Sequence, residues 1–484
     1  MSKLDLILLR FDYFLCMLCP TLRFFRTSLP GTCAYLLCLL SASGCALQRH
    51  QEAVLVLGDI AAGAAPSDLK ERTPQPSRTP IAYSIDGRAH IGDLYLPGEG
   101  KPEAGIVLVP GMVQEGKDAP NFVTFATTLA RARFAVVAPQ LSGHRDLRIE
   151  PGQAREVADA FRYLADREDL SPEGRAGIAG ISYALGPVMV AALEDDIRER
   201  VRFILGVGGY YDLRTAIRFV TTGYFEVDGS PRSVKSSQYG KLVFAKSVLN
   251  DLHDPKDRAI FEEMVEVKLK DFNADISPLA EGLGPEGMSV HRLLNNTDPR
   301  LTPQLIAALP PATVATIDAL TLSDKDLTRL TARLLLVHGK NDTLIPYPES
   351  VALSNAVASS RARVFILNGV LGHVDLTLSR FFSMRFWTTE LPDAWRLFRA
   401  ANLLLKEREL PVAAKTVKQA KVVIGPDVGD RKVPVFSSAS NKPGSMAQSL
   451  DHGNNSDHIR IGQTGSAPRN PAHPSLFAPA PQTH

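Results

Sequence analysis

Apolar and polar positions in the middle of the chain alternate between short, continuously apolar runs and longer amphipathic segments. The runs that predict strands are 105–109, 134–138, 175–181, 201–207, 334–337 and 364–367. The segments that predict helices are 121–132, 152–166, 184–194, 348–358 and 391–405. Continuous apolar strands separated by helices are typical of a mostly parallel sheet covered by helices on both faces. In such sheets active sites lie outside the carboxyl ends of the strands.

Two segments depart from this rhythm. Residues 81–85 and 90–96 are β-prone runs joined through Asp86-Gly87, which favours a tight hairpin and an antiparallel entry to the sheet. Residues 213–330 are helical in character and far longer than an ordinary connection, with predicted helices at 240–252, 257–269, 301–308 and 312–319. We therefore expect a helical cap insertion over the sheet.

The first 45 residues have the order of a secretory signal peptide. Counted from Met17, which we consider a possible true start, Arg23 and Arg26 precede an apolar run at 34–40 and small residues at 41–44. The apolar run is shorter than the roughly 20 residues that span a bilayer. Ala42-Ser43-Gly44-Cys45 resembles a bacterial lipobox, which usually has Leu at the position of Ala42.

That resemblance implies a lipid on Cys45, attachment to a membrane and a place in the bacterial cell envelope. Export to the periplasm without a lipid, an uncleaved anchor and a cytoplasmic protein stay open as alternatives. Residues 46–80 are expected to form a linker with one apolar stretch, 53–57, that can dock on the body. The body is expected over 81–410, and 411–484 is rich in Pro, Ser, Asn and Gly, which predicts a disordered tail.

Composition excludes several classes of function. Lys and Arg number 54 against 52 Asp and Glu, and the body has no dense basic stretch, so a nucleic-acid partner is not expected. All five cysteines lie in the first 45 residues, so the body has no disulfide, thiolate zinc site or cysteine nucleophile. It also lacks metal-ligand spacing of His and Cys and any nucleotide, flavin or pyridoxal motif, so no metal or organic cofactor is predicted.

Gly180-Ile181-Ser182-Tyr183-Ala184 follows a predicted strand and opens a predicted helix. Small residues two before and two after a serine allow the sharp turn that exposes its hydroxyl at the sheet edge. In this context the motif resembles the nucleophile elbow of the α/β-hydrolase superfamily, most closely its dienelactone-hydrolase-like and peptidase-like esterases. The family more often has Gly at the position of Ala184. A strand–helix turn without chemistry is the alternative.

The resemblance implies further site residues. The strand before His338-Gly339 delivers Asp342, where the family places its acid; a simple helix cap or Asx turn is the alternative role, and Asp212 is the rival acid. The last predicted strand leads to His373, at the position of the family's base. His144 resembles a loop histidine of the family, and His338 is expected to be structural.

The oxyanion donors implied by the resemblance are backbone N–H groups. Pro110 stands where the family commonly has His before Gly111, which leaves Met112 as the first donor, with Val113 as an alternative, and Tyr183 as the second. Because both donors are backbone groups, side-chain replacement would test them poorly.

These residues predict a serine hydrolase that cleaves a carboxylic ester through an acyl-enzyme on Ser182, Asp342 and His373. The expected partner is a small-molecule ester, with an apolar acyl group if residues such as Phe244 and Phe261 line its site rather than the cap core. Two other readings remain: an acyltransferase on the same triad, and a non-catalytic, membrane-tethered scaffold that kept the fold. A metalloenzyme has less support.

Overall fold

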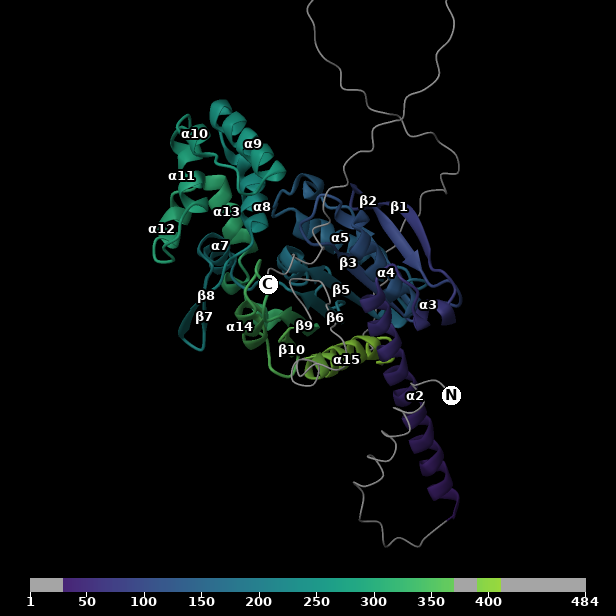
Figure 1. The fold of residues 1–484 in the computed structure, drawn as a ribbon. Coiled ribbons are helices and arrows are strands. Elements are labelled where there is room, and N and C mark those ends of the chain that lie inside the picture. The colour runs from purple at the N-terminus through teal and green to yellow at the C-terminus, as the bar shows by residue number, and fades with distance from the viewer. Residues whose placement is uncertain (1–28, 370–389, 411–484) are drawn as a thin grey trace, which may run out of the picture. The chain divides into compact units, whose positions relative to one another are not determined.

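An eight-stranded sheet is the centre of the part of the chain described by the computed structural model, residues 29–369 and 390–410 (Figure 1). Its strands are β1 (Ser77–Ile85), β2 (Arg88–Leu96), β3 (Ala104–Val109), β4 (Phe134–Pro139), β5 (Ala176–Ile181), β6 (Phe203–Val207), β9 (Arg333–Gly339) and β10 (Ala362–Leu367). They are ordered β1-β2-β4-β3-β5-β6-β9-β10. β2 pairs antiparallel with β1 and with β4, and every other pair is parallel.

This strand order, with a single reversed strand near one edge, is the α/β-hydrolase fold that the resemblance implied. The hairpin at Asp86-Gly87 is also confirmed, because β1 and β2 pair in register from Ser77 with Leu96 to Ile85 with Arg88. The six predicted parallel strands begin and end within two residues of their predicted bounds, and β3 and β4 are buried along their whole length.

Helices cover both faces of the sheet. On one face α5 (Gln153–Ala165), α6 (Leu185–Ala191) and α14 (Pro348–Ala356) share a core with side chains such as Val107 and Ile178. On the other, α2 (Leu29–Ala62), α4 (Pro120–Arg131) and α15 (Leu391–Lys406) share a core with Ile106 and Phe134. Neighbouring residues of one strand, Ile106 and Val107, point to opposite cores, as the two-residue period of a strand requires.

The insertion between β6 and β9 is mainly helical, as predicted. It consists of α7 (Leu213–Thr222), α8 (Gln238–Val248), α9 (Pro255–Lys270), α10 (Ser277–Ala280), α11 (Pro285–Leu294), α12 (Thr302–Ala307) and α13 (Pro311–Leu320), which Figure 1 draws in teal and green. A two-stranded hairpin, β7 (Tyr224–Val227) with β8 (Ser230–Ser233), lies between α7 and α8 and was not predicted. Apolar side chains of the insertion form one cluster with Met112 and Tyr183, so the insertion contacts the carboxyl edge of the sheet.

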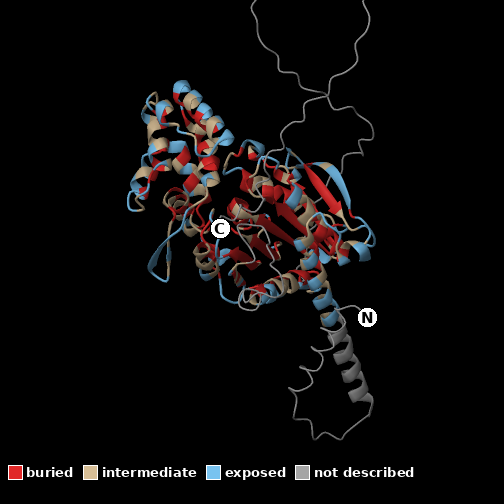
Figure 2. Cartoon of the chain, in the orientation of Figure 1, coloured by how far each residue is buried: buried red, intermediate tan, exposed pale blue. Residues whose placement is uncertain are grey.

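Residues 46–80, expected to be a linker, are largely regular structure. They contain the end of α2, the short helix α3 (Asp68–Arg72) and the start of β1. Ala53 and Val56 are buried against the α4 and α15 face, so the apolar stretch at 53–57 docks on the body (Figure 2). Asp59 is buried in the same face, where it accepts a hydrogen bond from Thr128 Oγ1 at 2.6 Å and pairs with Lys70 Nζ at 2.8 Å.

Most of the predicted signal peptide and all of the predicted disordered tail lie outside the described residues. The structure does not describe residues 1–28 and 411–484. Cys45, the predicted lipidation site, lies within the backbone of α2, and its side chain is outside the described part. None of the helices within 29–369 and 390–410 is both long and apolar enough to cross a membrane.

Candidate active site

Ser182 lies at a strained turn between β5 and α6. Its φ is 56°, in the left-handed region that L-residues other than Asn and Asp seldom enter. Such a conformation costs on the order of 1–3 kcal/mol and persists only where the surroundings enforce it. The strained serine at a strand-to-helix turn is the backbone geometry of a nucleophile elbow.

Gly180 makes this turn possible, and Gly111 lies beside it. A Cβ at Gly180 would lie 2.9 Å from both the Cα and the N of Leu185, closer than real Cβ atoms come to backbone atoms. A Cβ at Gly111 would lie 3.4 Å from Ser182 Cβ. The loop after β3, which carries the predicted oxyanion donor, therefore passes directly beside the serine. Ala184, where the family more often has Gly, is buried and fits in the first helical turn.

Asp342 follows the end of β9 and is buried, with 4% of its surface exposed. Its Oδ1 accepts hydrogen bonds from the N–H groups of Leu344 at 2.7 Å and Ile345 at 3.0 Å, which is the Asx turn considered as its alternative role. The turn occupies Oδ1, and Oδ2 lies 3.2 Å from Nε2 of His338. An Asx turn and a catalytic role are therefore compatible at Asp342.

His338 holds the loop that carries Asp342. Its imidazole is fully buried; Nδ1 lies 2.7 Å from Ser350 Oγ, and Nε2 lies 2.9 Å from the Ile345 carbonyl and 3.2 Å from Asp342 Oδ2. Both ring nitrogens of His338 therefore have partners, and Nε2 contacts two groups of the loop that carries Asp342. His338 has the structural environment expected from its place at the strand end.

The rival acid, Asp212, caps a helix. Its Oδ1 accepts hydrogen bonds from the N–H groups of Arg214 at 2.8 Å and Thr215 at 3.4 Å at the start of α7, and its Oδ2 accepts one from Ser323 Oγ at 2.8 Å. These are the bonds of a helix N-cap. Both carboxylate oxygens of Asp212 thus have structural partners.

Glu349 on α14 is a buried carboxyl group beside Asp212 that the sequence did not single out. Its Oε2 accepts hydrogen bonds from the N–H groups of Tyr211 and Asp212, each at 2.9 Å, and its Oε1 accepts one from Thr215 Oγ1. Burial raises the pKa of Glu349, and the nearby charge of Asp212 adds to that increase. Glu349 joins α14 to the loop after β6.

The predicted oxyanion loop is held by His144. His144 is buried, and its Nε2 lies 2.7 Å from the Gly111 carbonyl oxygen, to which it donates. Burial lowers the pKa of His144, so the ring is neutral near pH 7, with the proton on Nε2 and an unprotonated Nδ1 that has no partner among the described residues. The carbonyl of Gly111 and the N–H of Met112 belong to one peptide group, so this bond also orients the Met112 N–H.

The backbone N–H groups of Met112 and Tyr183, the two predicted oxyanion donors, have no acceptor required by the local backbone structure. No described residue accepts a hydrogen bond from the Met112 N–H. Tyr183 begins a helical turn, where the first N–H groups have no acceptor within the helix. The buried Tyr183 hydroxyl donates to Gln153 Oε1 at 3.0 Å, and Gln153 Nε2 donates to the carbonyls of Ser142 and Arg148 in the His144 loop.

His373, the predicted base, lies outside the described residues. Within the described residues the fold places Ser182, Asp342, Met112 and Tyr183 at the carboxyl edge of the sheet, where parallel sheets place active sites. No group of three or more His, Cys, Asp or Glu side chains in these residues could hold a metal ion.

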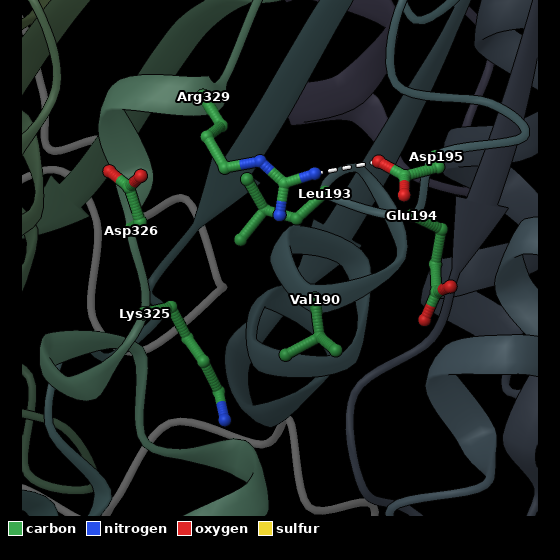
Figure 3. Close-up of a pocket in the computed structure, with 7 residues that line it drawn as sticks. All are labelled: Val190, Leu193, Glu194, Asp195, Lys325, Asp326 and Arg329. Carbon is green, nitrogen blue, oxygen red and sulfur yellow. Dashed lines mark hydrogen bonds and ion pairs between the residues drawn. The ribbon is translucent and has the colours of Figure 1, made fainter.

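A hollow of about 320 Å³ lies elsewhere on the body, and Figure 3 shows the side chains that line it. It is lined by Val190, Leu193, Glu194, Asp195, Lys325, Asp326 and Arg329. α6 runs back from Ser182 toward the amino edge of the sheet, and residues 325–329 come just before β9 begins. The hollow therefore lies toward the edge opposite Ser182 and contains none of the predicted catalytic residues.

The sequence did not indicate two residues that contact Met112 or Tyr183, the residues of the predicted oxyanion donors. Tyr239 in α8 donates its hydroxyl to the Met112 carbonyl oxygen at 2.9 Å, across 127 positions of sequence. Gln153 bonds both Tyr183 and the His144 loop. Neither residue lies in a recognisable motif, and both contacts depend on the packing of distant segments.

Comparisons with known proteins find similarity among solved structures alone. No family model and no curated protein matches the chain. A protein of Legionella pneumophila that carries a provisional hydrolase assignment is 16% identical, with 71% of this chain and 92% of that one covered and a TM-score of 0.44. An esterase of Pyrobaculum calidifontis is 13% identical, with 80% and 100% covered and a TM-score of 0.39.

A puromycin-hydrolyzing peptidase of Mycobacterium tuberculosis is 15% identical over 69% of this chain, with a TM-score of 0.38. The chain spans only 40% of the length of that peptidase. The fold of this chain is established by its own strand order and its two cores.

Proposed function

We propose that the chain is a serine hydrolase that cleaves a carboxylic ester through an acyl-enzyme. Ser182 is the nucleophile, His373 the base that removes its proton and later activates water, and Asp342 the acid that orients His373. The N–H groups of Met112 and Tyr183 stabilise the oxyanion. The observation that carries this proposal is the left-handed backbone of Ser182 at the β5–α6 turn, with the loop of Met112 directly beside it.

The physical argument starts from what a serine nucleophile needs. A hydroxyl reacts slowly at neutral pH unless a base lies within hydrogen-bond reach and fixed donors stabilise the developing charge. The bond from His144 to Gly111 fixes the direction of the Met112 N–H, so that donor needs no reorganisation during the reaction. Asp342 has one oxygen fixed in its turn and is buried, which suits the orienting group of a triad.

The test is covalent labelling of the full chain with a fluorophosphonate probe, together with hydrolysis of a p-nitrophenyl ester. We expect labelling and hydrolysis in the wild type and the loss of both, by about 10⁴-fold or more in kcat, in Ser182→Ala and in His373→Ala. Ser359→Ala is the matched control, because Ser359 is exposed on a surface turn.

The outcomes separate the candidate functions. A folded wild type that neither labels nor hydrolyses contradicts the proposal and favours the scaffold reading. Labelling that survives in Ser182→Ala would place the nucleophile elsewhere. Products in which an added alcohol, rather than water, carries the acyl group would favour the acyltransferase.

A further inference from the structure

α8 begins with contacts to the loops that carry the predicted oxyanion donor and the predicted acid. The Tyr239 hydroxyl donates to the Met112 carbonyl oxygen at 2.9 Å. Two residues earlier, the N–H of Ser237, the N-cap of α8, donates to the Thr343 carbonyl oxygen at 2.8 Å. Thr343 directly follows Asp342. The start of α8 therefore joins the two loops from the side of the insertion.

The same helix also binds the loop of His144. Ser247 Oγ accepts from the Ile149 N–H at 3.3 Å, and its hydroxyl lies 3.1 Å from the Leu147 carbonyl oxygen and 2.8 Å from the Val243 carbonyl oxygen of its own helix. Val243, Phe244 and Val248 of α8 belong to the apolar cluster that includes the side chains of Met112 and Tyr183. Polar and apolar contacts thus hold α8 against three loops of the carboxyl edge.

Two bonds on neighbouring carbonyls fix the oxyanion loop. His144 holds the Gly111 carbonyl from the body, and Tyr239 holds the Met112 carbonyl from the insertion. In a trans peptide the C=O and the N–H point in opposite directions, so the His144 bond sets the direction of the Met112 N–H and the Tyr239 bond that of the Val113 N–H. These two groups are the candidates for the first oxyanion donor. Burial raises the pKa of the Tyr239 hydroxyl, which keeps it protonated as a donor.

We propose that Tyr239 is a positioning residue for the hydrolysis, through which the insertion fixes the oxyanion loop. The inference rests on the proposed function. Within the insertion it is then the start of α8 that positions the oxyanion loop, because moving α8 away releases the Met112 carbonyl. A donor that aligns with charge developing in the transition state acts on kcat and leaves the binding of the uncharged ester almost unchanged.

The test compares Tyr239→Phe with Tyr224→Phe in the full chain. Tyr224 is the matched control: it belongs to the same insertion, and its hydroxyl donates to Glu226 rather than to the oxyanion loop. Losing an oxyanion donor outright costs about 10²–10³ in kcat, so for a donor that is loosened we expect about a 10-fold loss in Tyr239→Phe. KM for the p-nitrophenyl ester should stay within about 2-fold.

A transition-state analogue gives a readout that a purely structural role would not move. Affinity for a trifluoromethyl ketone should fall in Tyr239→Phe by the same factor as kcat/KM, because both depend on the oxyanion donors. Tyr239→4-aminophenylalanine, which keeps a donor at that position, should restore most of the activity. If Tyr239→Phe does not fold, 4-fluorophenylalanine at position 239 gives the same comparison at nearly unchanged volume.

The outcomes keep this inference distinct from the proposed function. A wild type that hydrolyses the ester, with Tyr239→Phe equal to Tyr224→Phe, overturns the inference alone. A raised KM with unchanged kcat also overturns it, because Tyr239 would then contact the substrate. A wild type that neither hydrolyses nor labels overturns the proposed function and this inference with it.

Discussion

The carboxyl edge of the sheet and the hollow of Figure 3 keep their polar side chains in different surroundings. At the carboxyl edge His338, Asp342, Glu349 and His144 are buried, and hydrogen bonds to backbone groups fix each of them. At the hollow Asp195 pairs with Arg329 at 2.6 Å and with Arg198 at 2.8 Å while its side chain is 81% exposed.

The difference indicates which polar side chains have a role beyond keeping the protein soluble. A buried polar group costs free energy unless its partners replace water, so a fold retains many of them only where their geometry matters. Exposed ion pairs contribute about 0–1 kcal/mol each and tolerate exchange. The carboxyl edge therefore has the organisation of a functional site, and the open hollow of Figure 3 does not.

The largest expected effect separates the two candidate acids. Asp342→Asn keeps an oxygen that can accept from Leu344 and Ile345 but removes the charge, so we expect kcat/KM for the ester to fall by about 10⁴-fold. Asp212→Asn should change kcat/KM by less than about 2-fold, because Asn is also a good N-cap. Steady-state kinetics measures both, and the reverse result would make Asp212 the acid.

Glu349 gives a pH-dependent test of burial at the carboxyl edge. Because its folded pKa is raised, Glu349 binds its proton more strongly in the folded state, and the associated stability is present at low pH and is lost as pH rises above about 4.5. Glu349→Gln should remove this loss, about 1.4 kcal/mol for each unit by which the pKa is raised. Urea unfolding of both proteins from pH 4.5 to 8 measures it; parallel pH profiles would contradict the expectation.

The smallest effect is expected at the hollow. Asp195→Asn removes the charge that Arg329 and Arg198 contact, yet the free energy of unfolding should change by less than about 1 kcal/mol. Ester hydrolysis should be unchanged. A clear loss of kcat in this variant would mean that the hollow of Figure 3 takes part in the function, and the contrast between the carboxyl edge and the hollow would not hold.

Strands and most helices could be predicted because the pattern of apolar and polar residues within each segment indicates its secondary structure. The run that predicted a strand at 134–138 became β4, Phe134–Pro139, and the segment at 257–269 became α9, Pro255–Lys270. The hairpin of β7 and β8 could not be predicted, because Ser230–Ser233 is exposed, contains a proline and has no apolar period. α2 was not predicted, because its residues at 46–62 pack on α4 and α15, which come much later in sequence.

The residues of the candidate site also divide into those that local sequence indicates and those that depend on tertiary packing. The places of Ser182 and Asp342 at the sheet edge could be predicted, because each comes within three residues of the end of a strand, while their catalytic roles stay predictions. His373 remains a prediction, since it lies outside the described residues. The contacts of Tyr239, Glu349 and Gln153 could not be predicted, because each joins segments that only tertiary packing brings together.

The docking of α2 sets the smallest piece of this protein that can fold independently. Arg408, just after α15, is buried and forms an ion pair with Glu52 at 2.6 Å, and Arg49 donates to Asn402 Oδ1 at 3.0 Å. A fragment cut at Ser77 would keep the whole sheet but leave Arg408 without Glu52 and uncover the face that Ala53 and Val56 fill. Such a fragment should aggregate, whereas one that starts before Arg49 and ends after Leu410 retains both halves of this junction.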